Sequence, residues 1–187
     1  MKKHLLLTAF LWSSLSFAHE CCTEITPLLG YNMAEGNINV RNYLTYGGEI
    51  QWNNLPSIIK PELFLLSGSS KYAAPRSSKG KTTRFTRLGI HGIYDIDTIE
   101  FLPPFTSFKP FVKAGLGYEK LSATANSGNH NSFYLDAGAG LKIFLLPQIA
   151  LKVEALYMLK NNKRRYDNNL NFLFGIDFFV NFEYLYE

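Results

Sequence analysis

The segment from Leu170 to Tyr186, LNFLFGIDFFVNFEYLY, alternates between two kinds of side chain. Every second residue from Leu170 is apolar or aromatic, and this row carries no charge. The other row contains Asn171, Asp177 and Glu183. Because successive side chains of a β-strand point to opposite faces, a period of two indicates a strand. The segment is therefore predicted to be a strand with one apolar face and one polar face.

The same alternation recurs along most of the chain, between clusters of Asn, Gly, Ser, Pro and Lys that are typical of turns. The further alternating segments are 28–33, 44–52, 62–66, 87–94, 109–119, 133–143 and 149–157. With the last segment they make eight strands, and no stretch has the helical period. A chain of 187 residues with 47% hydrophobic residues is long enough for one folded domain. The sequence therefore predicts an all-β fold, an eight-stranded antiparallel β-barrel.

The N-terminus has the three parts of a secretory signal peptide. Lys2 and Lys3 precede an apolar run from Leu5 to Leu15, and Ser16-Phe17-Ala18 supplies small residues for cleavage. The run is shorter than the roughly 20 residues that a spanning helix needs. The predicted division is a signal peptide over 1–18, a leader over 19–25 and the β-barrel over 26–187. Without the two lysines the formal charge falls from +4 to +2, which does not indicate a nucleic-acid partner.

Two cysteines, Cys21 and Cys22, follow the predicted cleavage site. Small residues would precede a lipid-modified cysteine, whereas His19 and Glu20 stand here. His19 and the two cysteines lack a fourth ligand for a zinc site. Neither a metal nor another cofactor is predicted.

Strands with one apolar and one polar face fit two kinds of barrel. A soluble exported ligand-binding barrel turns the apolar rows inward, and an outer-membrane barrel turns them toward lipid. The polar rows contain both signs of charge and many glycines, which favours a narrow, crowded lumen. The predicted lumen charges are Glu49, Glu62, Arg87, Lys113, Glu119, Asp136, Lys142, Lys152, Glu154 and Asp177. Tyrosines and Trp52 near the ends of the apolar rows are typical of a membrane interface, so the transmembrane barrel is preferred.

Opposite charges confined in a lumen are expected to pair, because an unpaired buried charge costs several kcal/mol. The hypothesis is that the carboxylates are partnered by the cations and that this network holds the barrel shut. The proposed pairing joins Glu49, Glu119, Asp136, Glu154 and Asp177 to Arg87, Lys113, Lys142 and Lys152. His91, on the same face, is predicted to be a hydrogen-bonded lumen residue.

With the N-terminus in the periplasm, residues 34–42, 67–83, 120–131 and 159–168 become surface loops. Two of these loops are basic. Their cations are Lys71, Arg76, Lys79, Lys81, Lys160, Lys163, Arg164 and Arg165. They could contact lipopolysaccharide phosphates or a host polyanion, or they could simply be solvated.

Six parts of the chain are PLLGYNMAEG, LTYGGEIQWN, KPFVKAGLGYE, LDAGAGLKI, LKVEALYML and the aromatic last strand. Together they resemble the OmpA-like family of small outer-membrane β-barrels. The resemblance implies residence in the outer membrane of a Gram-negative bacterium, contact with outer-membrane lipid and lipopolysaccharide, and a structural or surface-contact role. It also implies that the barrel-assembly machinery recognises the C-terminal strand. This chain departs from the family pattern because Glu187 follows the final aromatic residue, Tyr186.

One motif suggests an alternative function as a lipid A-modifying enzyme. His130-Asn131-Ser132 has the His-x-Ser spacing of outer-membrane lipid A deacylases, in which serine is the nucleophile and histidine its base. In that family the motif lies on the penultimate strand beside Asn-Ala-Gly, whereas here it opens an earlier strand. Because no acid is placed to orient the base, no enzymatic activity and no catalytic residue are predicted.

Overall fold

The computed structural model describes residues 22–34, 42–55, 57–71, 82–96, 99–100, 107–123, 130–146, 148–162 and 165–180. The predicted signal peptide and the end of the chain beyond residue 180 lie outside these residues. No helix in the described part is long and apolar enough to cross a membrane.

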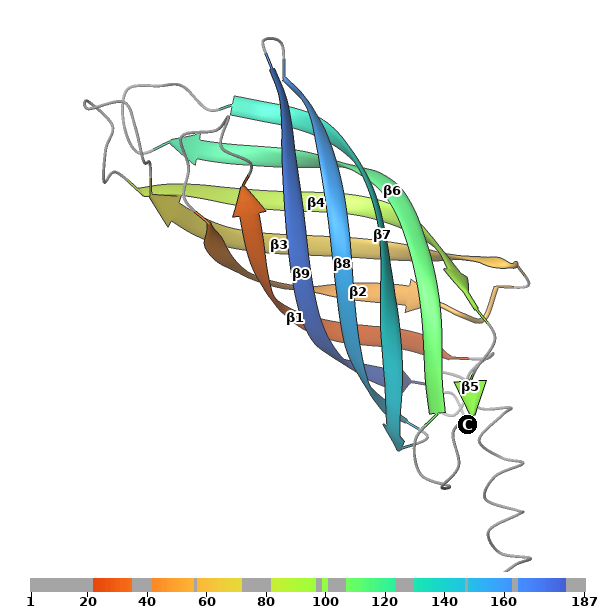
Figure 1. The fold of residues 1–187 in the computed structure, drawn as a ribbon. Coiled ribbons are helices and arrows are strands. Elements are labelled where there is room, and N and C mark those ends of the chain that lie inside the picture. Colours follow the sequence, from red (N-terminus) through yellow and green to blue (C-terminus); the bar gives the residue numbers. More distant parts are fainter. Residues whose placement is uncertain are drawn as a thin grey trace, which may run out of the picture.

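Eight long strands and one short strand form a single antiparallel sheet that closes on itself (Figure 1). The strands are β1 (Thr23–Ala34), β2 (Tyr43–Trp52), β3 (Ile59–Lys71), β4 (Thr82–Asp95), β5 (Ile99–Glu100), β6 (Ser107–Ala123), β7 (His130–Leu146), β8 (Ile149–Asn162) and β9 (Arg165–Val180). Pairing of β1 with β9 and of β4 with β6 closes the barrel, and β5 adds two pairs at the start of β6. The predicted eight-stranded barrel is confirmed. The end where β1 begins and β9 finishes is called the terminal end, and the opposite end is called the loop end.

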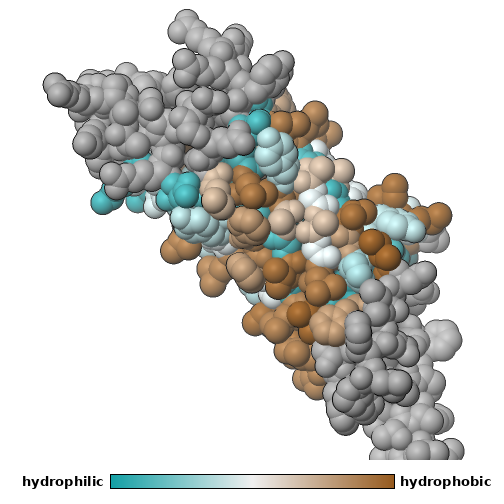
Figure 2. Space-filling view, viewed as in Figure 1, coloured by the Kyte–Doolittle hydropathy of each residue, from teal (hydrophilic) through white to brown (hydrophobic). Residues whose placement is uncertain are grey.

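The two faces of each strand are sorted as the alternation predicts, with apolar side chains outside. Leu44, Phe133 and Leu29 are 73%, 71% and 69% exposed, while Leu173, next to the outward Phe174, is fully buried. Figure 2 shows apolar side chains over the strand region of the surface. Water would oppose so large an apolar surface, whereas acyl chains favour it. The soluble barrel with an apolar interior is therefore wrong.

Several strands are longer than the alternation of apolar and polar residues predicted. The barrel was predicted to begin at Thr26, but β1 starts at Thr23 and its first residues pair with Trp52 and Val180. The predicted leader over 19–25 is thus too long. The predicted loop over 159–168 is also wrong, because β8 and β9 stay paired up to Asn162 and Arg165. Polar residues ended the alternation in the sequence, but backbone pairing continues past the apolar zone irrespective of side-chain type.

Candidate functional site in the barrel lumen

The middle of the lumen holds one group of charged side chains, here called the central cluster. Its members are Glu49, Glu62, His91, Lys113, Asp136, Lys152 and Glu154, and all are buried. Lys113 Nζ lies 2.7 Å from Glu49 Oε1 and 2.8 Å from Glu154 Oε2. Lys152 Nζ lies 2.5 Å from the other oxygen of Glu49. Each lysine therefore contacts more than one carboxylate, and Glu49 joins the two lysines.

His91 connects two carboxylates of the central cluster. Its Nδ1 lies 2.8 Å from Glu62 Oε1, and its Nε2 lies 3.1 Å from Asp136 Oδ2. Both ring nitrogens face acceptors, so the arrangement is fully satisfied when both donate. The prediction that His91 is a hydrogen-bonded lumen residue is confirmed.

A second polar group, the loop-end cluster, is centred on Arg87. Its Nε lies 2.6 Å from Glu119 Oε2, its Nη2 donates to Tyr43 Oη at 2.6 Å, and its Nη1 donates to Asn171 Oδ1 at 2.9 Å. Lys160 Nζ approaches the second oxygen of Glu119 at 2.8 Å. A planar guanidinium can direct its donors to three partners at once, which a lysine cannot do in the same geometry.

A third group, the terminal-end cluster, lies near the start of β1. Lys142 Nζ contacts Glu24 Oε2 at 2.5 Å and donates to Gln51 Oε1 at 3.0 Å. Asn53 accepts from Gln51 at 2.6 Å and donates to Glu24 at 2.7 Å. The amides thus satisfy acceptors that Lys142 alone does not reach.

An apolar layer separates the loop-end cluster from the central cluster. It consists of Leu28, Phe64, Leu66, Tyr134, Leu156, Met158 and Leu173, which pack together and are almost completely buried. On β8, Leu156 and Met158 lie in the inward row between Glu154 and Lys160. The lumen is therefore stratified, with ionic groups on both sides of a hydrocarbon plug.

Many contacts in the clusters cross the bore. β3 and β8 are diametrically opposite, since three long strands separate them in either direction. Lys152 of β8 nevertheless lies 3.1 Å from Glu62 of β3. Arg87 of β4 and Asn171 of β9 also join opposite walls. Contacts of this kind fill the section of the barrel at their level.

Glycines in the inward rows make room for the large side chains. A Cβ on Gly115 would overlap the His91 ring and the Ile90 carbonyl oxygen, and would lie 3.1 Å from Asp136 Oδ1. A Cβ on Gly117 would overlap the Tyr134 hydroxyl group. Glycine is needed at these two positions because a neighbouring side chain packs against the backbone, and not because the chain turns there.

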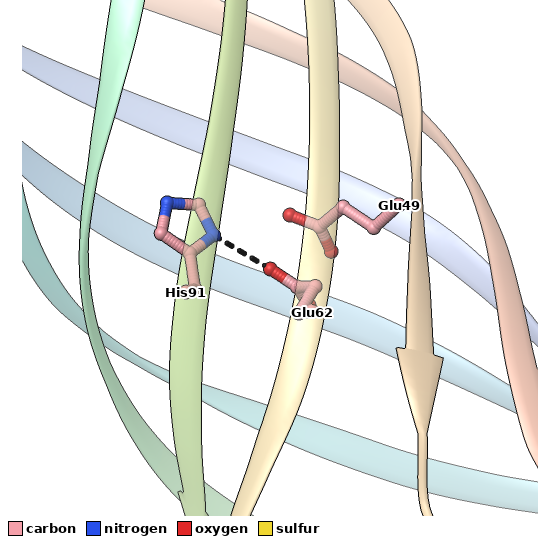
Figure 3. A group of neighbouring side chains, drawn as sticks. All are labelled: Glu49, Glu62 and His91. Carbon is pink, nitrogen blue, oxygen red and sulfur yellow. Dashed lines mark hydrogen bonds and ion pairs between the residues drawn. The ribbon is translucent and has the colours of Figure 1, made fainter.

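Three members of the central cluster, Glu49, Glu62 and His91, are close enough to share a metal ion (Figure 3). Glu62 and Glu49 are already the acceptors of two ammonium groups, those of Lys113 and Lys152. A metal ion would have to displace these cations from the same oxygens. The donor set therefore fits a closed salt-bridge cluster and does not fit a metal site.

A family model of the outer membrane protein beta-barrel domain matches residues 25–178. The chain belongs to this outer-membrane β-barrel family. Its place is accordingly the outer membrane of a Gram-negative bacterium, as the apolar outer wall also requires. No curated protein matches the chain.

Two solved structures of outer-membrane barrels have a similar fold. Neisserial surface protein A is 13% identical with a TM-score of 0.65, over 84% of this chain and 97% of that one. The N-terminal β-barrel domain of Pseudomonas aeruginosa OprF is 19% identical with a TM-score of 0.54, over 85% of this chain and 98% of that one. At these identities the likeness concerns the fold alone.

In this outer-membrane barrel, all ten residues predicted as lumen charges have buried side chains. Two of the predicted pairings differ from the observed contacts. Asp177 accepts a hydrogen bond from Thr26 at 2.6 Å, and Asp136 is bonded to His91. Glu24, predicted to belong to the leader, is a further buried lumen charge that contacts Lys142.

The predicted surface-loop patch is partly wrong. Lys160 lies in β8, is 6% exposed and contacts Glu119 in the lumen. Lys160 is an even number of residues from Lys152 and Glu154, which predicts that it shares their inward row. The polar residues that follow it resemble a loop and concealed this spacing. Lys71 is exposed on β3. The side chains of Arg76, Lys79, Lys81, Lys163, Arg164 and Arg165 lie outside the part of the chain whose side chains are described.

The His-x-Ser motif opens β7, as predicted. Ser132 stands opposite Glu119 in the β6–β7 register. Glu119 is already bound by Arg87 and Lys160. The side chain of His130 is outside the described side chains.

Proposed function

We propose that this outer-membrane protein is a closed, non-enzymatic barrel that acts through its outer surface, in a structural or contact role in the envelope. The observation that carries the proposal is the stratified lumen, in which an apolar layer lies between two salt-bridged clusters. An ion on this path would leave water to cross a packed hydrocarbon layer. It would also have to break contacts that join opposite walls.

The charge network is proposed to fix the relative positions of the walls, while the apolar layer blocks the bore. The lysines of the central cluster are fully buried, and each is surrounded by carboxylates from other strands. Burial of such groups is costly, so the network is expected to fix one arrangement of the walls more than to increase total stability.

Recordings from planar bilayers test the proposal. The refolded full chain is expected to give no stable conductance steps. A variant with Glu49, Glu62, Lys113 and Lys152 all replaced by Ser keeps the net charge of the lumen and should stay silent, because the apolar layer remains. Adding Phe64→Ala and Leu66→Ala should open a water path and produce conductance. Large, stable steps from the unmodified protein would contradict the closed-lumen proposal.

A separate assay addresses the proposed absence of enzymatic activity. Lipid A incubated with the folded protein is expected to keep its mass, and Ser132→Ala should make no difference. Loss of an acyl chain that depends on Ser132 would instead establish a lipid A deacylase.

A further inference from the structure

The outer wall of the barrel carries very few charges in the part of the chain whose side chains are described, and their distribution is one-sided. The outward rows of the eight long strands contain no carboxylate there. They contain three cations, Lys71 on β3, Arg84 on β4 and Lys120 on β6, all exposed. All three lie toward the loop end, on consecutive strands of the barrel. We call them the outer-wall cation patch.

The register brings the three cations of this patch together. Lys71 pairs with Thr82, two residues before Arg84, and Lys120 pairs with Thr86, two residues after Arg84. Diagonal neighbours of this kind on one face of a sheet are roughly 7–8 Å apart, within reach of long side chains. Two adjacent cations can therefore contact one anionic group from both sides.

From the patch toward the middle of the barrel, the outward side chains change from charged to hydroxyl-bearing to apolar. On β4 the outward residues after Arg84 are Thr86, then Leu88 and Ile90. On β3 the cation is followed by serines, Ser69 and Ser67, and then by leucine. The wall thus presents charge, then hydroxyl groups, then hydrocarbon, the order of groups along a lipid with a phosphorylated sugar headgroup and acyl chains.

A polar pocket opens beside the outer-wall cation patch. The β2–β3 ladder ends at Thr45 and Gly68, although both strands continue, β2 to Tyr43 and β3 to Lys71. A pocket of about 290 Å³ lies at this split in the wall. Its lining residues are Asn42, Tyr43, Ser69, Ser70, Lys71 and Thr82. The pocket side chains thus include amide, hydroxyl and ammonium groups, and the Tyr43 hydroxyl is already bound by Arg87. Such groups form hydrogen bonds with sugars and charge-assisted hydrogen bonds with phosphates.

We propose that the outer-wall cation patch and this pocket bind the phosphorylated sugar headgroup of lipopolysaccharide in the outer leaflet. Lys71, Arg84 and Lys120 would contact its phosphates, and the pocket would receive part of the sugar. The acyl chains would lie along Leu65, Leu88 and their neighbours. The inference rests on the proposed function and gives its outer surface a specific lipid partner. A lipid ligand is favoured over a soluble polyanion because the cations face sideways above the apolar wall.

Binding of lipid A to the refolded full chain in detergent tests the proposal. The main variant replaces Lys71, Arg84 and Lys120 by Gln. Each cation is expected to account for about fivefold in affinity, so the triple variant should bind on the order of a hundredfold more weakly at low salt. A charge-retaining triple variant, Lys71→Arg, Arg84→Lys and Lys120→Arg, should keep most of the affinity. Lys109→Gln, at the terminal end, is the positional control and should bind normally.

Two further arms identify the ligand. Lipid A stripped of its phosphates should bind the unmodified protein as weakly as phosphorylated lipid A binds the triple Gln variant. Inorganic phosphate and a sulfated polysaccharide should not compete at matched anion concentrations. Equal affinity of the triple Gln and unmodified proteins, equal losses in the Gln and charge-retaining variants, or full competition by either soluble anion would overturn the proposal. Gel mobility before and after heating verifies that each variant is folded. A silent barrel that fails to bind lipid A would refute this inference and leave the closed-lumen proposal intact.

Discussion

Lys152 and Glu62 stand on opposite walls of the barrel, and their charged groups meet inside it, with Nζ 3.1 Å from Oε2. Neither side chain is accessible to solvent. The contact therefore links β8 and β3 across the bore. These two strands are not neighbours, so no backbone hydrogen bond of the sheet joins them.

Replacing Lys152 by Met should destabilise the barrel strongly. Glu49 and Glu62 would lose one of their two lysine partners and stay buried, which costs about 3–5 kcal/mol when one member of a buried ion pair is removed. Urea unfolding of the protein in lipid vesicles, followed by the fluorescence of Trp52, gives the free energy of unfolding. Lys109→Met is the control, because the Lys109–Asp95 pair is partly exposed and should contribute less than about 1 kcal/mol.

The double variant Lys152→Met, Glu62→Gln separates loss of a partner from loss of packing. If the ion pair matters, the double variant should be more stable than the sum of the single effects by about 1 kcal/mol or more. Strict additivity would mean that the two groups do not interact across the lumen.

Two buried tyrosines should respond differently to loss of the hydroxyl group. The Tyr43 hydroxyl accepts from Arg87 at 2.6 Å, so Tyr43→Phe should cost about 1–3 kcal/mol by leaving a guanidinium donor unsatisfied. The Tyr134 hydroxyl has no hydrogen-bond partner in the described part of the chain. Tyr134→Phe should consequently be neutral or slightly stabilising. The same urea titration compares them, and a larger loss for Tyr134→Phe would be inconsistent with the apolar layer as described.

Arg87→Lys should be far from conservative. Three nitrogens of Arg87 reach Glu119, Tyr43 and Asn171, and a single ammonium group cannot occupy those three positions. We expect a loss of about 2 kcal/mol, from at least one unsatisfied buried group. Unfolding measurements that give unchanged stability would show that the loop-end cluster rearranges freely.

Replacing a glycine by alanine should lower stability more inside the lumen than on the outer wall. Gly115→Ala would push into His91 and Asp136 and should cost roughly 1–3 kcal/mol, the usual penalty of overpacking. A Cβ on the outward Gly92 would meet only Cγ2 of Ile59, whose side chain is exposed and has room to move aside. Gly92→Ala should therefore change stability by less than about 1 kcal/mol. Similar mobility shifts on heating for both variants, with equal unfolding midpoints, would argue against a crowded lumen.

Much of the barrel could be predicted from sequence because strand alternation is local. The spacing of Glu154, Leu156 and Met158 determines that they share a face whatever the rest of the chain does. Which residues meet depends on how the first and last strands close the barrel, so Asp177 on β9 could not be matched to Thr26 on the adjoining β1 in advance. Strand ends were missed for a different reason. Polar residues around Lys160 resemble a loop, although the ladder continues through them.

The apolar layer was not predicted from the sequence, although the chain contains a sign of it. Leu63-Phe64-Leu65-Leu66 breaks the alternation because its inward members, Phe64 and Leu66, are apolar as well as its outward ones. In a two-faced strand, an apolar residue in the polar row marks a place where the lumen is filled by hydrocarbon. Only the closed barrel shows that four other strands, β1, β7, β8 and β9, contribute to the same layer.

Apolar rows face acyl chains while charged rows fill the bore. This orientation can be tested with a fluorescent label attached to a single cysteine at Phe174 or at Leu141, in protein whose Cys21 and Cys22 have been replaced by Ser and which is folded into vesicles. We predict that lipids brominated on their acyl chains quench both labels and that iodide in the water does not. Strong quenching by iodide, with little effect of the brominated lipids, would contradict the account.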